Sequence, residues 1–201
     1  KVRYEILKRF DYFVTESSEH FAEYVPWFIK QNRLDLINKY KIPVGEYLDR
    51  CKMYEDMWKE LDNDMAPISD QPIKRSNEYA SYIMESVCGQ KEVTVYGNII
   101  NNGLIENLPK DCCVEVPCLV NSHGFHPQKI GKLPEHLAAL MRTNINVQLL
   151  TAEAAITKKR NHIYHAAMLD PLTSSNLSID EIYKMTNEMI EAHGSFLPKY
   201  N

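Results

Sequence analysis

The sequence predicts an α+β fold in which long helices pack on a small, antiparallel sheet. Two runs rich in β-branched residues, VTVYGNII (93–100) and CCVEVPCLV (112–120), lie mid-chain and are each followed by turn residues. The segments on either side of them carry apolar residues at helical spacing. One of these segments, after Pro134, continues to about residue 157 without Gly or Pro and predicts a helix of roughly 36 Å. We therefore expect one α+β domain over residues 1–201.

Four short elements are expected in the first forty residues, at 1–10, 12–14, 19–24 and 32–40. The apolar run at 12–14 is short enough for a strand, whereas the other three segments favour helices. Ser17 or Ser18 can cap the helix at 19–24, and Pro26 ends it. Asn32 can cap the helix that follows.

A longer helix is predicted from Glu46 to Leu61, with apolar residues on one face. We expect this face to contact the core through Leu48, Cys51, Met57, Trp58 and Leu61. After a polar loop, Ser76 is the expected cap of another helix, and Gly89 closes it.

The C-terminal third is predicted to be helical after a short third segment, FHPQKIG, at 125–131. Proline is favoured at the first helical position, so Pro134 is expected to begin the long helix. Two further helices are expected, at 160–169 and 179–193. Ser178 and Glu181 form the capping-box pattern S-x-x-E, and Gly194 ends the last helix.

The composition is ordinary for a globular chain, with 44% hydrophobic and 25% charged residues. A net charge of -4 argues against a broad nucleic-acid surface. No apolar stretch approaches the ~20 residues that span a bilayer, and the charged start KVRYEILKRF is unlike a signal peptide. We therefore expect a cytoplasmic protein whose partners include neither nucleic acid nor a membrane.

The five cysteines show no metal-ligand spacing. Cys112, Cys113 and Cys118 all lie in the apolar run 112–120. This placement is typical of reduced thiols in a protein interior, and we expect all three to be reduced and mostly buried.

Motifs for nucleotide or structural zinc binding are absent from the sequence, which contains no G-x-G-x-x-G, no Walker loop and no zinc spacing. Two histidine pairs are spaced by three residues and could each hold a metal, His123 with His126 and His162 with His165. A solvated or core-edge role is the better interpretation of both pairs. Tyrosines of the 76–89 helix, Tyr79 and Tyr82, could serve as bases, but packing explains them better.

The segment 15–24 is the most unusual part of the chain, because polar and titratable side chains crowd beside Tyr24, Trp27 and Phe28. Such an arrangement is typical of sugar sites, where aromatic rings stack on the sugar and polar groups bond its hydroxyls. The candidate hydroxyl-binding residues are Glu16, Ser18 and His20. Helix capping with a solvated charged face is the alternative interpretation.

A group of asparagines near the end of the first strand offers the same choice between turn chemistry and ligand binding. Its members are Asn98, Asn101, Asn102 and Asn107. Of these, Asn101 is the one that we expect to contact substrate.

Four long motifs resemble a known family: TESSEHFAEYVPWF (15–28), NNGLIENLPKDCCVEVPCLV (101–120), LPEHLAALMRTNINVQLLTAEAAIT (133–157) and YHAAMLDPLTSSNLSIDEIY (164–183). Together they resemble the C-terminal half of the α-galactosidases (melibiases) of glycoside hydrolase family 4. The resemblance extends over essentially the whole chain, in order. It implies a Rossmann-containing enzyme whose N-terminal domain lies outside these 201 residues. The chain also does not begin with Met, so we expect it to be part of a longer protein.

The resemblance implies an NAD-dependent mechanism unlike that of two-carboxylate glycosidases. Carbon 3 of the sugar is oxidised, a base removes the proton of carbon 2, the aglycone is eliminated, water adds and the hydride returns. The implied cofactors are NAD and a divalent metal, usually Mn2+, whose family ligands precede the matched region. We therefore assign no cofactor-binding and no metal-binding residue to this chain.

In family members that act on phosphorylated sugars, the base is a tyrosine from a segment corresponding to about 15–24. This sequence lacks their Y-L-x-Y-Y pattern, so Tyr24 is the candidate base, with Glu16, Ser18 or His20 as alternative pocket residues. The implied partners are an α-galactoside of the melibiose or raffinose type, the N-terminal Rossmann half and further copies of the chain in a homo-oligomer.

Three alternatives stay open at the level of sequence. The enzyme could act on α-glucosides or on α-galacturonides, or the chain could be a non-catalytic sugar-binding or scaffold domain. An acidic substrate calls for basic side chains in the pocket. The basic residues that could lie near it are Lys30, Arg33, Lys74 and Arg75.

Overall fold

The computed structural model describes residues 1–63 and 78–201, with side chains for 1–60 and 78–201. Its helices before the sheet are α1 (Val2–Phe10), α2 (Ser18–Tyr24), α3 (Leu34–Tyr40), α4 (Glu46–Asn63) and α5 (Ala80–Val87). Its strands are β1 (Val93–Ile100), β2 (Cys113–Asn121) and β3 (Gly124–Pro127). The helices after the sheet are α6 (Glu135–Thr157), α7 (Arg160–Leu169), α8 (Pro171–Asn176) and α9 (Ile179–His193), followed by the 3-10 turn η1 (Gly194–Phe196). The predicted α+β class is confirmed.

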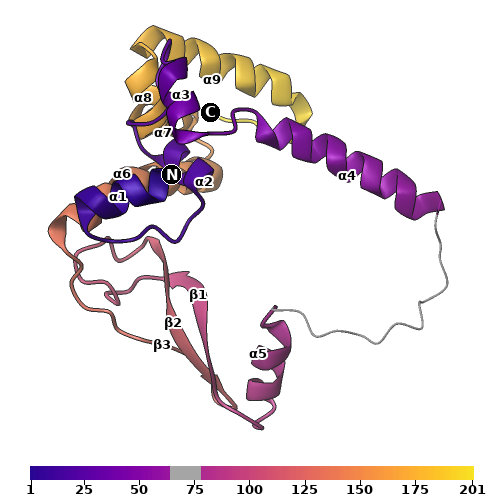
Figure 1. Ribbon diagram of the computed structural model, residues 1–201, viewed down its shortest axis with the longest axis vertical. Coiled ribbons are helices and arrows are strands. Elements are labelled where there is room, and N and C mark those ends of the chain that lie inside the picture. Colours follow the sequence, from indigo (N-terminus) through magenta and orange to yellow (C-terminus); the bar gives the residue numbers. More distant parts are fainter. Residues whose placement is uncertain (64–77) are drawn as a thin grey trace.

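The sheet is antiparallel, as predicted, with strand order β1-β2-β3 (Figure 1). Val93 pairs with Val120 at one end of the first ladder and Ile100 with Cys113 at the other. Alternate residues of β2, from Val114 to Val120, are buried, whereas Cys113 and Glu115 face the opposite side and are exposed. One face of β2 therefore belongs to the core, and the other remains available for a site.

Two hydrophobic clusters form the interior. The larger lies at the sheet and includes Val116 and Val120, both with no exposed surface, together with Ala138 and Ile145 of α6. The smaller gathers the buried residues Val2, Ile6, Ala22, Val25, Phe28 and Ile42, and Leu140 of α6 packs against it. Helix α6 therefore contributes to both clusters, and Figure 1 shows α1 and α2 lying over it, above the sheet.

Local capping signals match the structure well. The Ser17 hydroxyl accepts a hydrogen bond from the backbone N–H of His20 at 3.2 Å, so Ser17 is the cap of α2. Ser178 and Glu181 form the complete capping box at the start of α9. Gly194 is its C-cap with a positive φ of 49°, as the sequence predicts.

Three local predictions are wrong. Residues 12–14 form a bend followed by irregular backbone, and no segment of the described chain pairs with them as a strand. Asn32 adopts φ 60° in the turn before α3, and Arg33 occupies the N-cap position. Pro134 precedes the first helical turn as the N-cap of α6 and is not its first residue. Each error concerns a boundary or a pairing partner, which local sequence specifies weakly.

Helix α4 exists as predicted, but its expected core contacts do not. Leu48, Met57 and Trp58 are 73%, 46% and 71% exposed, because α4 points away from the rest of the described chain (Figure 1). Cys51 is only partly buried, and the Leu61 side chain lies outside the described side chains. The predicted cap Ser76 also lies outside the described residues; the next described helix, α5, has Tyr79 as its N-cap. None of the described helices combines the length and apolarity needed to cross a membrane.

The expectation of three buried thiols holds for two of them. Cys112 and Cys118 are 1% and 3% exposed, and neither is in a disulfide. Cys113 is exposed, which corrects the prediction. Adjacent strand residues face opposite sides, and none of the described elements covers the side to which Cys113 points.

We expect native labelling with a thiol reagent to separate the cysteines into two groups. Cys88 and Cys113 should react rapidly because they are exposed. Cys112 and Cys118 should react at least about tenfold more slowly, since reagent access requires local opening. Burial, followed by the charge of Asp111, also raises the pKa of the Cys112 thiol and lowers its thiolate fraction. Mass spectrometry of labelled peptides measures the rates, with urea-unfolded protein as control. Equal native rates would contradict the buried placement.

Candidate active site

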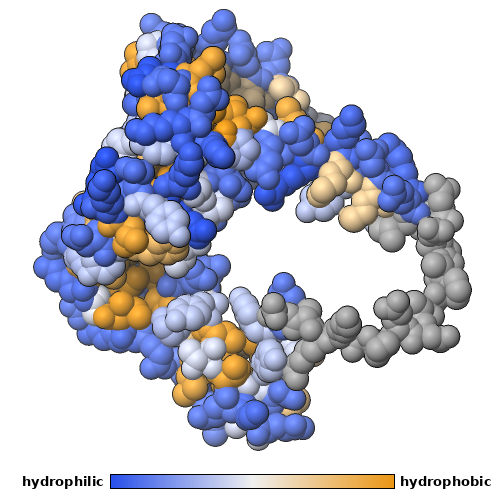
Figure 2. All heavy atoms as spheres, viewed as in Figure 1, coloured by the Kyte–Doolittle hydropathy of each residue, from blue (hydrophilic) through white to orange (hydrophobic). Residues whose placement is uncertain are grey.

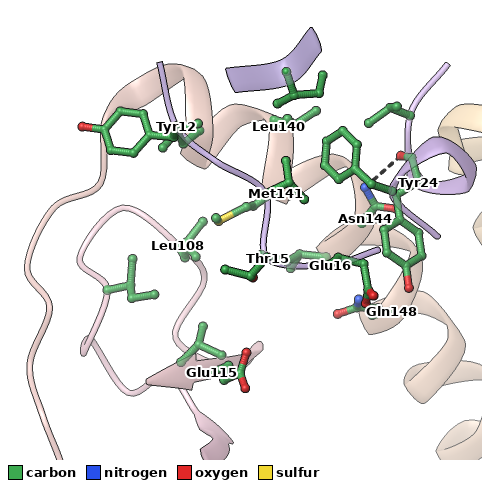
Figure 3. A pocket seen from close by; sticks show the side chains of 18 of the residues that line it. Tyr12, Thr15, Glu16, Tyr24, Leu108, Glu115, Leu140, Met141, Asn144 and Gln148 are labelled. Carbon is green, nitrogen blue, oxygen red and sulfur yellow. Dashed lines mark hydrogen bonds between the residues drawn. The ribbon is translucent and has the colours of Figure 1, made fainter. Parts of the chain in front are cut away.

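A cavity of about 550 Å³ opens between the segment 12–25, helix α6 and the outer face of strand β2 (Figure 3). It lies where the two hydrophobic clusters approach each other, and Figure 2 shows apolar side chains gathered between α1 and the sheet. Most of its lining is apolar. The polar side chains in the lining are Tyr12, Thr15, Glu16, Tyr24, Glu115, Asn144 and Gln148. The cavity is therefore an apolar hollow with a few polar groups, the usual build of a small-molecule site.

Tyr24 is placed by the short helix α2, of which it is the last residue. Ala22 and Val25, both buried in the smaller cluster, fix the end of this helix against α1 and α6. The Nδ2 amide of Asn144 on α6 donates a hydrogen bond of 3.1 Å to the Tyr24 carbonyl. Tyr24 is thus held at the cavity by packing on one side and a hydrogen bond on the other, with its ring 43% exposed.

The electrostatic surroundings of Tyr24 keep its phenol protonated. Burial, followed by the negative charges of Glu16 and Glu23, raises the pKa of Tyr24 above its ordinary value. Figure 3 shows Glu16 and Gln148 beside the Tyr24 side chain. Use of Tyr24 as a base at neutral pH therefore requires a cation that none of the cavity-lining residues supplies.

Glu16 lies at the same wall of the cavity, just before the cap of α2. Its Oε1 accepts a hydrogen bond of 2.7 Å from the backbone N–H of Ser17, which orients the carboxylate. No described residue donates a hydrogen bond to its Oε2. Glu16 can therefore still accept a hydrogen bond from a ligand hydroxyl.

The other two candidates from this segment are not brought into the cavity. Ser18 is the first residue of α2 and is partly buried. His20 is exposed, with Nδ1 3.7 Å from Oε2 of Glu23 on the same helix. Neither lines the cavity. Trp27 also lies elsewhere, in a separate hollow of about 280 Å³ with Phe10 and Tyr40.

Asn101 is completely buried and bonded to the backbone of its own loop. Its Nδ2 lies 2.9, 3.2 and 2.9 Å from the carbonyl oxygens of Ile105, Leu108 and Pro109, respectively. Its Oδ1 accepts from the N–H of Ile105 at 2.7 Å. The side chain organises the loop that carries Leu108 to the cavity, and it does not itself line the cavity.

Sequence reasoning missed the polar residues that other elements supply. Asn144 and Gln148, four residues apart on α6, face the cavity together, but amides in a helix carry no local signal of function. Glu115 was detectable in principle, since it is a charged residue within an otherwise apolar strand.

The described residues do not form a metal site. No group of three or more His, Cys, Asp or Glu side chains in residues 1–60 and 78–201 could hold a metal ion. The rings of His162 and His165 lie 6.2 Å apart, and Nε2 of His126 lies 3.1 Å from Oδ1 of Asn121. Tyr79 and Tyr82 do not line the main cavity. The described side chains therefore offer no three-residue group that could hold the metal.

Comparison with known proteins places the chain in a family. Residues 1–173 match the family described as "Family 4 glycosyl hydrolase C-terminal domain". The α-galactosidase of Bacillus subtilis (strain 168) is 46% identical over 199 residues, which cover 99% of this chain and 46% of that protein. The chain thus spans about half the length of the curated relatives that it matches.

Solved structures show the same fold. A 6-phospho-α-glucosidase from gut microorganisms, in complex with NAD and glucose-6-phosphate, is 27% identical over 60% of this chain and 26% of its own, with a TM-score of 0.54. The Thermotoga maritima 6-phospho-β-glucosidase with manganese, NAD+ and glucose-6-phosphate is 24% identical over 76% of this chain and 37% of its own, with a TM-score of 0.62. The chain therefore belongs to the family 4 glycosyl hydrolases, as their C-terminal domain.

Proposed function

We propose that this chain is the substrate-covering and oligomerisation domain of an NAD- and manganese-dependent α-galactosidase. The complete protein hydrolyses α-galactosides of the melibiose and raffinose type in the cytoplasm, as a homo-oligomer. The observation that carries the proposal is the cavity in which Tyr24 and Glu16 share one wall, within a chain 46% identical to an α-galactosidase. The NAD bound to the 27%-identical relative supports the choice of cofactor.

In this proposal, NAD+ and the metal are held outside this chain, where they supply a hydride acceptor and a positive charge. Tyr24 removes the proton from carbon 2 of the sugar once carbon 3 is a ketone. The pKa of Tyr24 in this chain is raised by burial, Glu16 and Glu23, so the positive charge is needed to lower it.

Glu16 is the side chain that we propose for a ring hydroxyl, since it lines the cavity beside Tyr24. Ser18 and His20, which lie outside the cavity lining, remain candidates for contacts at its rim. Asn101 stabilises the loop that lines the cavity, because its side-chain amide forms hydrogen bonds with the backbone of that loop.

A direct assay of the full-length protein tests this function. Release of nitrophenol from nitrophenyl α-galactoside should depend on both NAD+ and Mn2+. The 201-residue chain alone should release none, because elimination from carbon 2 requires the ketone first. Added NAD+ should bind to it weakly or not at all. Hydrolysis by the isolated chain, or by the full-length protein without NAD+, would contradict the proposal, and sugar binding without turnover by the full-length protein would favour a non-catalytic domain.

A further inference from the structure

The charged side chains that line the main cavity are all acidic. They are Glu16, from the segment before α2, and Glu115, from the exposed face of β2. No Lys, Arg or His is among the cavity-lining residues in the described part of the chain. Of the basic residues expected near a pocket, Lys30 and Arg33 do not line it, and Lys74 and Arg75 lie outside the described residues. The cavity wall that this domain supplies therefore carries negative charge.

No side chain in the described part of the domain, residues 1–60 and 78–201, forms an ion pair with either carboxylate, Glu16 or Glu115. Arg33, by contrast, is engaged by Asp35, with Nη2 2.7 Å from Oδ2. Figure 3 shows the carboxyl groups of Glu16 and Glu115 at separate places around the cavity. A ligand group between these walls meets negative charge from both the α2 side and the β2 side.

The charge of Glu16 also acts on another residue of the cavity lining, Tyr24. It contributes to the raised pKa of Tyr24, whose ring lines the same hollow. The side chains between the carboxylates are apolar, among them Leu108, Leu140 and Met141. Apolar walls weaken screening by water and let a cleft of one charge sign influence a ligand more strongly.

Exposed carboxylates on a protein surface are usually no more than a solvated face. Two features distinguish this pair. Both carboxylates line a concave site, whose volume of about 550 Å³ suits a sugar, and no cation of that lining offsets them. A neutral glycoside offers hydroxyl donors to such groups, whereas a uronate or a sugar phosphate offers a second anion.

We propose that Glu16 and Glu115 form a charge filter, which admits neutral glycosides and disfavours substrates that carry a carboxylate or phosphate. The filter rests on the proposed glycosidase function and assigns its substrate class to two residues. Glu16 acts twice, because it accepts a hydroxyl hydrogen bond from a neutral sugar and repels an anionic one. Glu115 acts through its charge from the β2 side of the cavity.

The test compares two substrates that differ chiefly at carbon 6, nitrophenyl α-galactoside and nitrophenyl α-galacturonide. The full-length protein with NAD+ and Mn2+ is assayed as wild type, Glu16→Gln and Glu16→Gln/Glu115→Gln. The ratio of kcat/KM for galacturonide over galactoside should rise about tenfold in Glu16→Gln and further in the double variant. The increase should shrink at high salt, because salt screens the repulsion in the wild type. Gln keeps a carbonyl oxygen that can accept the Ser17 N–H bond, so the local backbone is preserved.

Glu23→Gln is the matched control. Glu23 also raises the pKa of Tyr24, but it does not line the cavity. Its replacement should move the pH profile of kcat towards lower pH, because loss of a negative charge favours the phenolate. The substrate ratio should stay within about twofold of wild type. If the galacturonide-to-galactoside ratio of kcat/KM rises as much in Glu23→Gln as in Glu16→Gln, the filter is overturned. The change in substrate preference would then come from the altered pKa of Tyr24.

A second measurement does not depend on turnover. Calorimetric titration of the wild type with galactose and with galacturonate should give weaker binding of galacturonate, and Glu16→Gln/Glu115→Gln should narrow the difference. If the wild type hydrolyses neither substrate, the proposed function fails while this binding comparison still judges the filter. The charge filter is overturned if the wild type binds galacturonate as tightly as galactose. It is also overturned if the enzyme is active and the double variant has the wild-type ratio of kcat/KM for galacturonide over galactoside.

Discussion

Replacement of Tyr24 by Phe in the full-length protein is expected to lower kcat on an α-galactoside by about 10²- to 10³-fold, the range for loss of a general base. The phenol oxygen is the group that we propose removes the proton of carbon 2. Phe keeps the ring that fills the end of the cavity and leaves the backbone carbonyl bonded to Asn144. KM should change little, because the ring still contacts the sugar. Steady-state kinetics of purified wild type and variant measure both constants.

Tyr79→Phe provides the control for this experiment. Tyr79 is 50% exposed at the start of α5 and does not line the cavity, so its loss should leave kcat within about twofold of wild type. A deuterium label at carbon 2 adds a sharper readout. A slow Tyr24→Phe variant should show a larger isotope effect than wild type, since proton removal becomes more rate-limiting. A Tyr24→Phe variant with undiminished kcat would exclude Tyr24 as the base.

Replacement of Asn101 by Ala is expected to destabilise the protein by about 3 kcal/mol. The change removes the donor that serves three backbone carbonyls and the acceptor of the Ile105 N–H, all in a site without exposed surface. Buried polar groups that lose their partners cost the full desolvation penalty. For a domain of this size, the loss corresponds to a fall in Tm of about 6 to 12 °C, which calorimetry can measure.

Asn101→Asp should be worse than Asn101→Ala, since a carboxylate would then face carbonyl oxygens. Asn98→Ala is the matched control, because Asn98 is a nearby asparagine that is exposed on β1. Its effect should stay within about 0.5 kcal/mol. An Asn101→Ala protein with wild-type Tm but reduced activity would instead restore Asn101 as a substrate-binding residue.

Local signals in the sequence were enough for most of the helices and strands. Ser17, the Ser178–Glu181 box and Gly194 specify helix ends through bonds within a few residues, so a linear pattern contains them. The alternation of β2 predicts a strand, although only the fold decides which of its faces is covered. Cys112 and Cys113 show that the pattern does not specify which face is covered, because Cys112 is buried and Cys113 is exposed. Helix α4 shows that apolar spacing does not by itself determine burial, since the apolar face of this helix packs on none of the described elements.

The sequence by itself determined the α+β class and the family, because both follow from local patterns and long motifs in the chain. It also offered the segment 15–24 as a candidate place for chemistry. The tertiary structure decided which members of that segment face a site. Tyr24 and Glu16 line the cavity, whereas Ser18 and His20 do not, because helix α2 directs successive side chains to different sides. It also decided that Asn101 is bonded to backbone and that Glu115, Asn144 and Gln148 join the site. These residues come from a strand and a helix separated in sequence, and only the tertiary fold brings their side chains to one cavity.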